Sequence, residues 1–251
     1  MSLEILYAIL FFIFGLCFGS FSNVLIYRLP KNESINFPAS HCQNCQTPLK
    51  WYHNIPLFSW IFLRGKCAFC KDKISIQYPL VELACGFLSI ICFFIEPNIL
   101  KAIFIAFTFI LLLDLSIIDF RYTAVPDALL YPVLITSLCY SLILDFNFMG
   151  IINAGFFAAI FWLLRLIVSF ALKREAMGSG DIFIAGVIGA ILNWKLSLIA
   201  IYLAAIFTLP AYVIVRKKNY ELPFVPFLAI GLFITWLFQT QILEILKKIY
   251  G

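Results

Sequence analysis

The chain has 251 residues, of which 63% are hydrophobic and 12% charged, and its mean hydropathy is +1.01. Soluble domains are about half apolar and about a quarter charged, so this composition excludes a water-soluble globular protein and indicates one embedded in membrane lipid. The net charge of +5 would suit a nucleic-acid partner, but the placement of the basic residues described below argues against one.

Eight apolar runs approach the length of about 20 residues that a helix needs to cross a bilayer. The first, residues 3–27, lacks a basic n-region and is too long for a signal peptide, so we interpret it as a retained membrane helix. A polar segment follows at 28–78. Further helices are predicted near residues 79–95, 99–118, 128–144, 150–172, 181–193, 196–215 and 223–246. The sequence therefore predicts an all-α polytopic membrane protein with about eight transmembrane helices.

The Lys and Arg residues fall mainly in the polar segment and in every second loop after it. One side of the predicted membrane holds Arg28, Lys31, Lys50, Arg64, Lys66, Lys71, Lys73, Arg121, Lys173, Arg174, Arg216, Lys217 and Lys218, and the other holds Lys101, Lys195, Lys247 and Lys248. Because cytoplasmic loops are enriched in basic residues, this split predicts that the polar segment is cytoplasmic and that both termini lie outside. It also accounts for the net charge without nucleic acid.

Two CxxC pairs lie in the polar segment, at Cys42 with Cys45 and at Cys67 with Cys70. Two such turns can aim four thiolates at one ion in a closed tetrahedral site, which suits structural zinc and leaves no open position for metal catalysis. Two disulfides or two redox motifs are the alternatives, but a reducing cytoplasm disfavours lasting disulfides. His41 is adjacent and is interpreted as a neighbour of the site.

Three carboxylates are predicted to lie together at the cytoplasmic edge of the membrane. Asp119 ends one predicted helix, Asp127 begins the next after Pro126, and Asp181 opens the short helix at 181–193. Charges in or beside membrane spans are usually functional. The other acidic residues in or beside spans are Glu82, Asp114 and Asp145, and Asp145 is predicted to be a solvated loop residue on the outer side.

Asp181 follows Gly178-Ser179-Gly180, where the two glycines would permit unusual backbone geometry and close approach of a peptide. A helix that starts here places the carboxylate at the positive end of the helix dipole, which favours its ionisation. A second carboxylate nearby would be pushed toward protonation. One ionised and one protonated Asp sharing a water make an aspartic peptidase centre. The alternative is an ordinary turn in which Asp181 caps the helix.

The chain resembles the type IV prepilin leader peptidase/N-methyltransferase family over nearly its whole length. The resemblance rests on Gly19-Ser20-Phe21, Asn23, Tyr27-Arg28-Leu29-Pro30, Ser40-His41-Cys42, Trp51-Tyr52-His53-Asn54-Ile55-Pro56, Ser59-Trp60, Arg64-Gly65-Lys66-Cys67, Tyr78-Pro79-Leu80-Val81-Glu82, Val125-Pro126-Asp127 and Met177-Gly178-Ser179-Gly180-Asp181.

The resemblance implies that Asp119 and Asp181 are the catalytic pair of a membrane aspartic peptidase, with Asp127 in support and Asp114 as the candidate if the alignment were shifted. It implies cleavage of the leader of type IV prepilins or pseudopilins at the cytoplasmic face of the bacterial inner membrane. It also implies N-methylation of the new N-terminus with S-adenosylmethionine as methyl donor. The corresponding domains would be residues 1–27 (first helix), 28–78 (the four-cysteine segment associated with methylation) and 79–251 (the peptidase).

Three positions depart from the family pattern. Ile182-Phe183-Ile184 stands where members often have Lys after the GxGD motif, His53 stands where many have an acid, and Gln77 where many have Arg. The polar segment has no glycine-rich turn after a strand, so no Rossmann-type cofactor site is predicted and no residue is assigned to the methyl donor. Arg28, Arg64 and Lys66 can be interpreted as residues that snorkel to the interface, and Glu82 as a buried polar contact. Two alternative functions stay open, namely a transporter or channel with intramembrane acids and a peptidase without methyltransferase activity.

Overall fold

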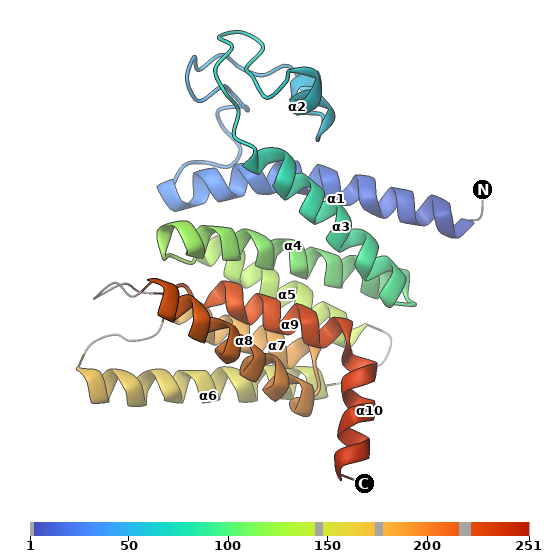
Figure 1. Cartoon of the computed structure of the whole chain (residues 1–251), viewed down its shortest axis with the longest axis vertical. Coiled ribbons are helices and arrows are strands. Elements are labelled where there is room, and N and C mark those ends of the chain that lie inside the picture. The colour runs from blue at the N-terminus through green and yellow to red at the C-terminus, as the bar shows by residue number, and fades with distance from the viewer. Residues whose placement is uncertain (1–2, 144–147, 174–177, 216–221, 251) are drawn as a thin grey trace. The chain divides into compact units, whose positions relative to one another are not determined.

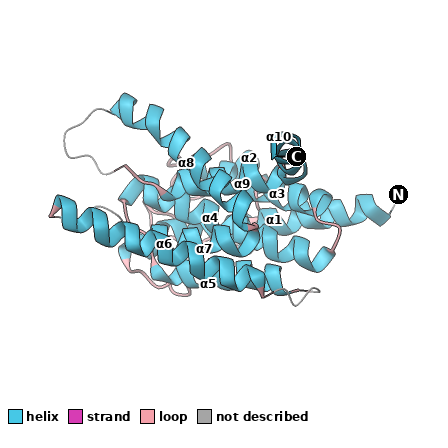
Figure 2. Cartoon of the chain, turned by 90° about the horizontal axis from the view of Figure 1, so that it is seen from below, coloured by secondary structure: helices cyan, strands magenta, loops and turns pink. Residues whose placement is uncertain are grey.

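The computed structural model describes residues 3–143, 148–173, 178–215 and 222–250. These residues form helices and loops, with no strand among them (Figure 1, Figure 2). The helices are α1 (Leu3–Arg28), α2 (Phe58–Phe62), α3 (Gln77–Ile95), α4 (Ile99–Tyr122), α5 (Asp127–Leu142), α6 (Met149–Leu172), α7 (Ser179–Ile191), α8 (Trp194–Val215), α9 (Val225–Leu237) and α10 (Gln239–Tyr250), with the 3₁₀ turns η1 (Leu29–Lys31) and η2 (Trp51–Asn54). The predicted all-α class is confirmed for this part of the chain.

Within the described ranges, five helices are long and apolar enough to cross a membrane, and the number is six if α9 and α10 form one broken span. The five are α1, α3, α4, α6 and α8, whereas α5 and α7 are apolar but shorter. The protein is therefore a multi-pass membrane protein, and the count of eight spans stays a prediction. The run predicted as one helix at 223–246 differs, because it breaks after Leu237 and bends by 76° into α10.

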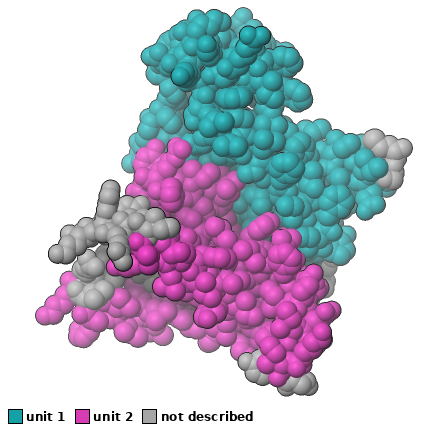
Figure 3. Space-filling model, in the orientation of Figure 1, with its two compact units in different colours: residues 1–110 teal, residues 111–251 magenta. Residues whose placement is uncertain are grey.

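The chain divides into two compact units, residues 1–110 and residues 111–251, which Figure 3 colours separately. The boundary falls inside α4. Compactness alone does not test the predicted functional division at residues 27 and 78, which stays a prediction. Asp145, Arg174, Met177 and the basic run at 216–218 lie outside the described residues.

In the first unit, α1 packs along α3 through small residues. Gly15 and Gly19 form a GxxxG pattern on α1, and a Cβ on Gly19 would lie 2.7 Å from the Cα of Glu82. A Cβ on Gly15 would overlap the carbonyl oxygen of Cys85. Because helices in lipid gain stability by close packing and not by leaving water, such small residues allow the two backbones to approach.

In the second unit, the short helix α7 is central, since it contacts α5, α6, α8 and α9. Nine of its thirteen residues are buried. Its surface is made of small residues such as Ala185 and Gly189, and the carbonyl of Asn153 on α6 would lie 2.5 Å from a Cβ on Gly189. A helix enclosed by other helices need not match the thickness of the bilayer. This accounts for the short length of the helix predicted at 181–193.

The contrast between two glycines gives a test of this packing. We expect Gly189→Ala to destabilise the protein by about 1–3 kcal/mol, because the added methyl meets backbone atoms that cannot rotate away. Gly155 on α6 has nothing within 4 Å of a built Cβ, so Gly155→Ala is expected to leave stability unchanged or raise it by up to about 1 kcal/mol. Thermal unfolding of both variants in detergent micelles measures the difference, and equal stabilities would contradict the packing described for α6 and α7.

Candidate functional site

Asp119 lies near the end of α4 and is only 6% exposed. Its Oδ2 accepts a hydrogen bond of 3.2 Å from the backbone N–H of Val225, the first residue of α9. The first N–H groups of a helix have no partner within the helix, so a carboxylate placed there satisfies one of them. The start of α9, 106 residues further along the chain, therefore fixes the position of the Asp119 side chain.

Asp181 is the third residue of α7 and is 7% exposed. The backbone N–H of Gly178 donates a hydrogen bond to its carboxylate. The side chain thus lies at the N-terminal, electropositive end of α7, as the sequence predicted. Asp119 and Asp181 are near enough for their charges to interact directly. The second unit therefore holds two buried carboxyl groups whose charges interact, one from α4 and one from α7.

The two glycines of the GxGD motif have different structural roles. Gly178 has an ordinary extended backbone, with φ −66° and ψ 151°, and a Cβ built on it would meet nothing closer than 3.8 Å. A Cβ on Gly180 would lie 2.8 Å from a methyl group of Val125. The unusual backbone geometry expected at this pair is thus absent, and Gly65 is the one glycine with positive φ among the described residues. What Gly180 provides is space for Val125.

The remaining acidic residues of the sequence analysis are placed differently. Asp114 is fully buried on α4, five residues before Asp119. Asp127 is exposed and is the first residue of α5, where its negative charge favours the start of the helix. Its expected role as a supporting residue that stabilises this helix stays a prediction.

Two contributors to this site were not identified from the sequence. Val225 contributes through its backbone N–H, which a sequence pattern does not reveal. Pro226 gave an indirect signal, because proline in the first turn of a helix marks a helix start and hence a set of unpaired N–H groups. Val125 was noted only as part of the Val-Pro-Asp step, and its contact with Gly180 depends on how the α4–α5 loop folds back onto α7.

The four cysteines of the polar segment meet at one point in the first unit. The sulfur atoms of Cys42, Cys45, Cys67 and Cys70 all lie within 4.8 Å of one another, and the Cys42 and Cys70 Sγ atoms are 3.7 Å apart. Four thiolates around a tetrahedral zinc ion, each bonded at about 2.3 Å, stand about 3.8 Å from each other. The donor set and its dimensions therefore fit zinc. His41 is not part of the cluster, since its Nδ1 lies 3.0 Å from the carbonyl oxygen of Ala39.

The two CxxC turns are structural copies of each other, with equivalent residues 25 positions apart. Backbone N–H groups of Cys42 and Cys67 donate to the carbonyls of Thr47 and Asp72. The N–H groups of Gln46 and Lys71 donate back to the two cysteine carbonyls, and both residues have positive φ. Isolated antiparallel bridges close the turns at His41 with Pro48 and at Lys66 with Lys73. Each copy thus delivers two sulfur atoms in the same local geometry.

The electrostatics of the cluster favour a bound cation. A side-chain hydrogen bond with Thr47 lowers the pKa of Cys45 to about 6, and the backbone N–H of Cys70 lowers the pKa of Cys67. At Cys70, the backbone N–H of Asp72 acts to lower the pKa, but burial and hydrogen bonds with the other three sulfurs outweigh it and raise the pKa to about 12. Four adjacent thiolates repel one another, so without a cation the last of them keeps its proton.

The charged residues of the first unit have mainly structural contacts. Arg28 is buried and donates to the carbonyls of Ser34 and Pro38, so its interpretation as a snorkelling residue is wrong. It holds the first turn of the polar segment against the end of α1. Arg64 and Lys66 are exposed. Glu82 is a buried polar contact, as one interpretation held, because its Oε2 accepts the backbone N–H of Leu57 at 2.8 Å.

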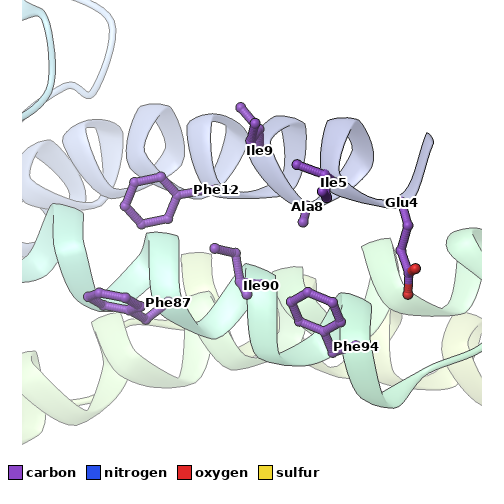
Figure 4. Close-up of a pocket in the computed structure, with 8 residues that line it drawn as sticks. All are labelled: Glu4, Ile5, Ala8, Ile9, Phe12, Phe87, Ile90 and Phe94. Atoms are coloured by element: carbon purple, nitrogen blue, oxygen red, sulfur yellow. The ribbon is translucent and has the colours of Figure 1, made fainter. Parts of the chain in front are cut away.

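A groove between α1 and α3 in the first unit has a volume of about 380 Å³ (Figure 4). Its lining is apolar apart from Glu4, and includes Phe12, Phe87 and Phe94. S-adenosylmethionine carries a sulfonium charge, a carboxylate, a ribose and an adenine, which need polar partners. The groove does not fit such a molecule, so it gives no position for a methyl donor.

Comparison with known proteins places both units in one family. Residues 13–95 match the bacterial peptidase A24 N-terminal domain, and residues 105–213 match the type IV leader peptidase family. Relatives named prepilin leader peptidase/N-methyltransferase include those of Klebsiella pneumoniae, 35% identical over 73% of this chain and 84% of the relative, and Stutzerimonas stutzeri, 32% identical over 92% and 90%. The match to the Myxococcus xanthus relative is 35% identical over 76% of this chain but spans only 57% of that protein.

No solved structure matches the chain. The first family model covers the four cysteines, and the second covers Asp119 and Asp181. The chain belongs to the type IV leader peptidase family.

Proposed function

We propose that this protein cleaves the leader peptide of type IV prepilins or pseudopilins and that Asp119 and Asp181 carry out the hydrolysis. The observation that carries the proposal is the pair of buried, mutually interacting carboxyl groups within the region that matches the leader peptidase family. The names of the relatives supply the substrate class.

The pair acts with one carboxyl group ionised and the other protonated, because two interacting carboxyl groups resist joint ionisation. The ionised group takes a proton from a water held between the two, and the water oxygen attacks the scissile carbonyl carbon. The protonated group gives its proton to the carbonyl oxygen. When the tetrahedral intermediate breaks its C–N bond, the carboxyl group that took the proton from water gives it to the leaving amine. The other carboxylate takes a proton back from a hydroxyl of the intermediate, so both groups regain their starting state.

Cleavage takes place at the cytoplasmic face of the bacterial inner membrane. The basic residues favour this side for the α4–α5 loop and for the start of α7, where the two aspartates lie. A precursor with a polar leader and an apolar helix presents its scissile bond at such a boundary, since the leader stays in water while the helix stays in lipid.

The second proposed activity is N-methylation of the new N-terminal residue with S-adenosylmethionine, which the names of the relatives support. The four cysteines would hold zinc, which supplies folding energy to a segment with little core of its own and no open coordination position for catalysis. Incubation of membranes with a prepilin and labelled S-adenosylmethionine tests both activities. Cleavage without transfer of label would identify a peptidase without methyltransferase activity.

The alternative of a transporter or channel is tested by the aspartates themselves. A transport pathway uses charged groups near the middle of the membrane, whereas both aspartates lie at helix ends. Unchanged prepilin cleavage by both Asp119→Asn and Asp181→Asn, in protein that still folds, would favour the alternative.

The contact of Gly180 with Val125 gives a more selective test of the peptidase site. We expect Gly180→Ala to slow cleavage by up to about 100-fold, because the added methyl would displace the Asp181 turn from the α4–α5 loop, and small displacements of catalytic groups have effects of this size. Cleavage rates of a purified prepilin measure the loss.

Two further variants separate a local clash from general damage. Gly178→Ala adds the same methyl where nothing lies within 3.8 Å, and we expect it to cleave at close to the unmodified rate. In the double variant Gly180→Ala with Val125→Ala, removal of the opposing methyl groups is expected to restore most of the lost activity. An equal loss in the Gly178 and Gly180 variants, or no recovery in the double variant, would contradict the role given to this contact.

A further inference from the structure

Helix α2 in the polar segment turns an apolar face outward. Phe58, Ile61 and Phe62 are at positions i, i+3 and i+4, so they share one side of the helix. Their exposed fractions are 58%, 62% and 81%. Three large apolar side chains on one face of a short helix form a surface that water does not favour, and another apolar phase must cover it.

The outward direction of this face is fixed by contacts on the other side of α2. Trp60 is half-buried, its ring lies against Gly65, and its Nε1–H donates to the carbonyl of Ile74 at 3.4 Å. Leu57, which precedes α2, has φ +61°, and its N–H is held by the Glu82 carboxylate. A non-glycine residue keeps such a backbone conformation only where its surroundings enforce it. The segment is therefore built to present Phe58, Ile61 and Phe62 to the outside.

The position of α2 indicates what covers this face. Leu57, the residue before α2, is hydrogen-bonded through its N–H to Glu82, which lies in the second turn of α3. Both helices belong to the first unit. Since α3 is long and apolar enough to cross a membrane, a segment bonded to its second turn lies near the end of a span, where lipid is within reach.

The residues beside this face match the boundary of a bilayer. Trp51 in η2 is 78% exposed and Tyr52 is exposed next to it. Trp and Tyr concentrate where the hydrocarbon meets the headgroups. Lys50, Arg64 and Lys66, all exposed, flank the aromatic residues in the sequence. Basic side chains next to an apolar face attract anionic phospholipids.

We propose that α2 and Trp51 insert into the phospholipid bilayer, with Phe58, Ile61 and Phe62 among the acyl chains and with Lys50, Arg64 and Lys66 at anionic headgroups. This inference goes beyond the proposed function and does not depend on either activity. It makes the four-cysteine segment a membrane-bound element, held at the lipid surface by α2 as well as by its connections to α1 and α3.

The test uses the full-length protein in lipid nanodiscs that contain phosphatidylglycerol. A small fluorescent amino acid replaces Phe62 in one sample and Gln43, an exposed residue of the first CxxC turn, in a control. Phospholipids brominated on the acyl chain quench fluorophores in the bilayer, and iodide quenches those in water. We expect bromolipid quenching to be several-fold larger at position 62 than at position 43, and iodide quenching to show the reverse order. Zinc content checks that the segment keeps its fold in both samples.

A second measurement tests the basic residues. In nanodiscs of phosphatidylcholine alone, bromolipid quenching at position 62 should fall, and the double change Lys50→Gln with Arg64→Gln should remove the difference between the two lipids. Strong iodide quenching with no bromolipid quenching at position 62 would overturn the proposal. So would a fluorophore that neither quencher reaches, or one that becomes shielded only when a prepilin is added, since the face would then be covered by protein.

Discussion

Replacement of Asp181 by Asn is expected to lower the rate of prepilin cleavage by about 100- to 10,000-fold, and Asp119→Asn is expected to do the same. Asn has almost the same shape as Asp and is uncharged, so it can still accept the N–H groups of Gly178 or Val225. It cannot take a proton from water or exchange one with the substrate. The rate of leader removal from a purified prepilin in proteoliposomes measures the effect.

Asp127→Asn is the matched control for this prediction. Asp127 is a carboxylate on the same side of the predicted membrane, but it is exposed at the start of α5, where loss of its charge removes only a weak interaction with the helix dipole. Its cleavage rate should stay within a few-fold of the unmodified rate. Because the two aspartates act as a unit in the proposed mechanism, the double variant Asp119→Asn with Asp181→Asn should be no slower than either single variant. Losses that multiply in the double variant would show that the two residues act independently.

The second large effect is expected at the four-cysteine cluster. Cys42→Ser should lower the zinc content from about one ion per chain to near zero, because three thiolates and a hydroxyl bind zinc far more weakly than four thiolates. The polar segment should then become sensitive to proteases, since the metal supplies much of its folding energy. Elemental analysis and limited proteolysis of the purified protein measure the two effects.

Cys17→Ser is the control, because Cys17 is an exposed residue of α1 and does not belong to the cluster. It should keep its zinc and its resistance to proteolysis. Prepilin cleavage by Cys42→Ser is expected to decline less than its zinc content, since both aspartates lie in the other unit. Zinc content that is unchanged in Cys42→Ser would contradict the assignment of the cysteines.

The sequence predicted the helices best where each was a long apolar run. Five helices lie within a few residues of the expected ranges, namely α1, α3, α4, α6 and α8. A membrane span needs a minimum length of apolar residues, and that length can be read directly from the sequence. The break at Phe238 was missed. The average hydropathy of residues 223–246 is high enough for one membrane helix, but α10 is amphipathic, with Glu244, Lys247 and Lys248 on one side. An average over the whole run hides this change in pattern.

The candidate site was predictable to the level of residue types but not to the level of contacts. The CxxC spacing predicted a cluster of Cys42, Cys45, Cys67 and Cys70, and the structure brings their sulfurs together, because each turn is a local feature that its own sequence determines. The roles of Asp119 and Asp181 in catalysis stay a proposal. The contact of Gly180 with Val125 and the hydrogen bond from Val225 to Asp119 join segments that are distant in the sequence. A single sequence does not indicate which distant residues are in contact.

The repeated CxxC turns have a consequence for the order of events while the chain is being made. The first hairpin leaves the ribosome with two sulfurs, which is half of the ligand set, and cannot form a tight metal complex until Cys70 has followed. Only six residues lie between Cys70 and Gln77, where α3 begins. The proposed zinc ion can therefore bind with all four sulfurs only when the start of α3 is being made, and we expect metal supply to affect the membrane insertion of this part of the chain.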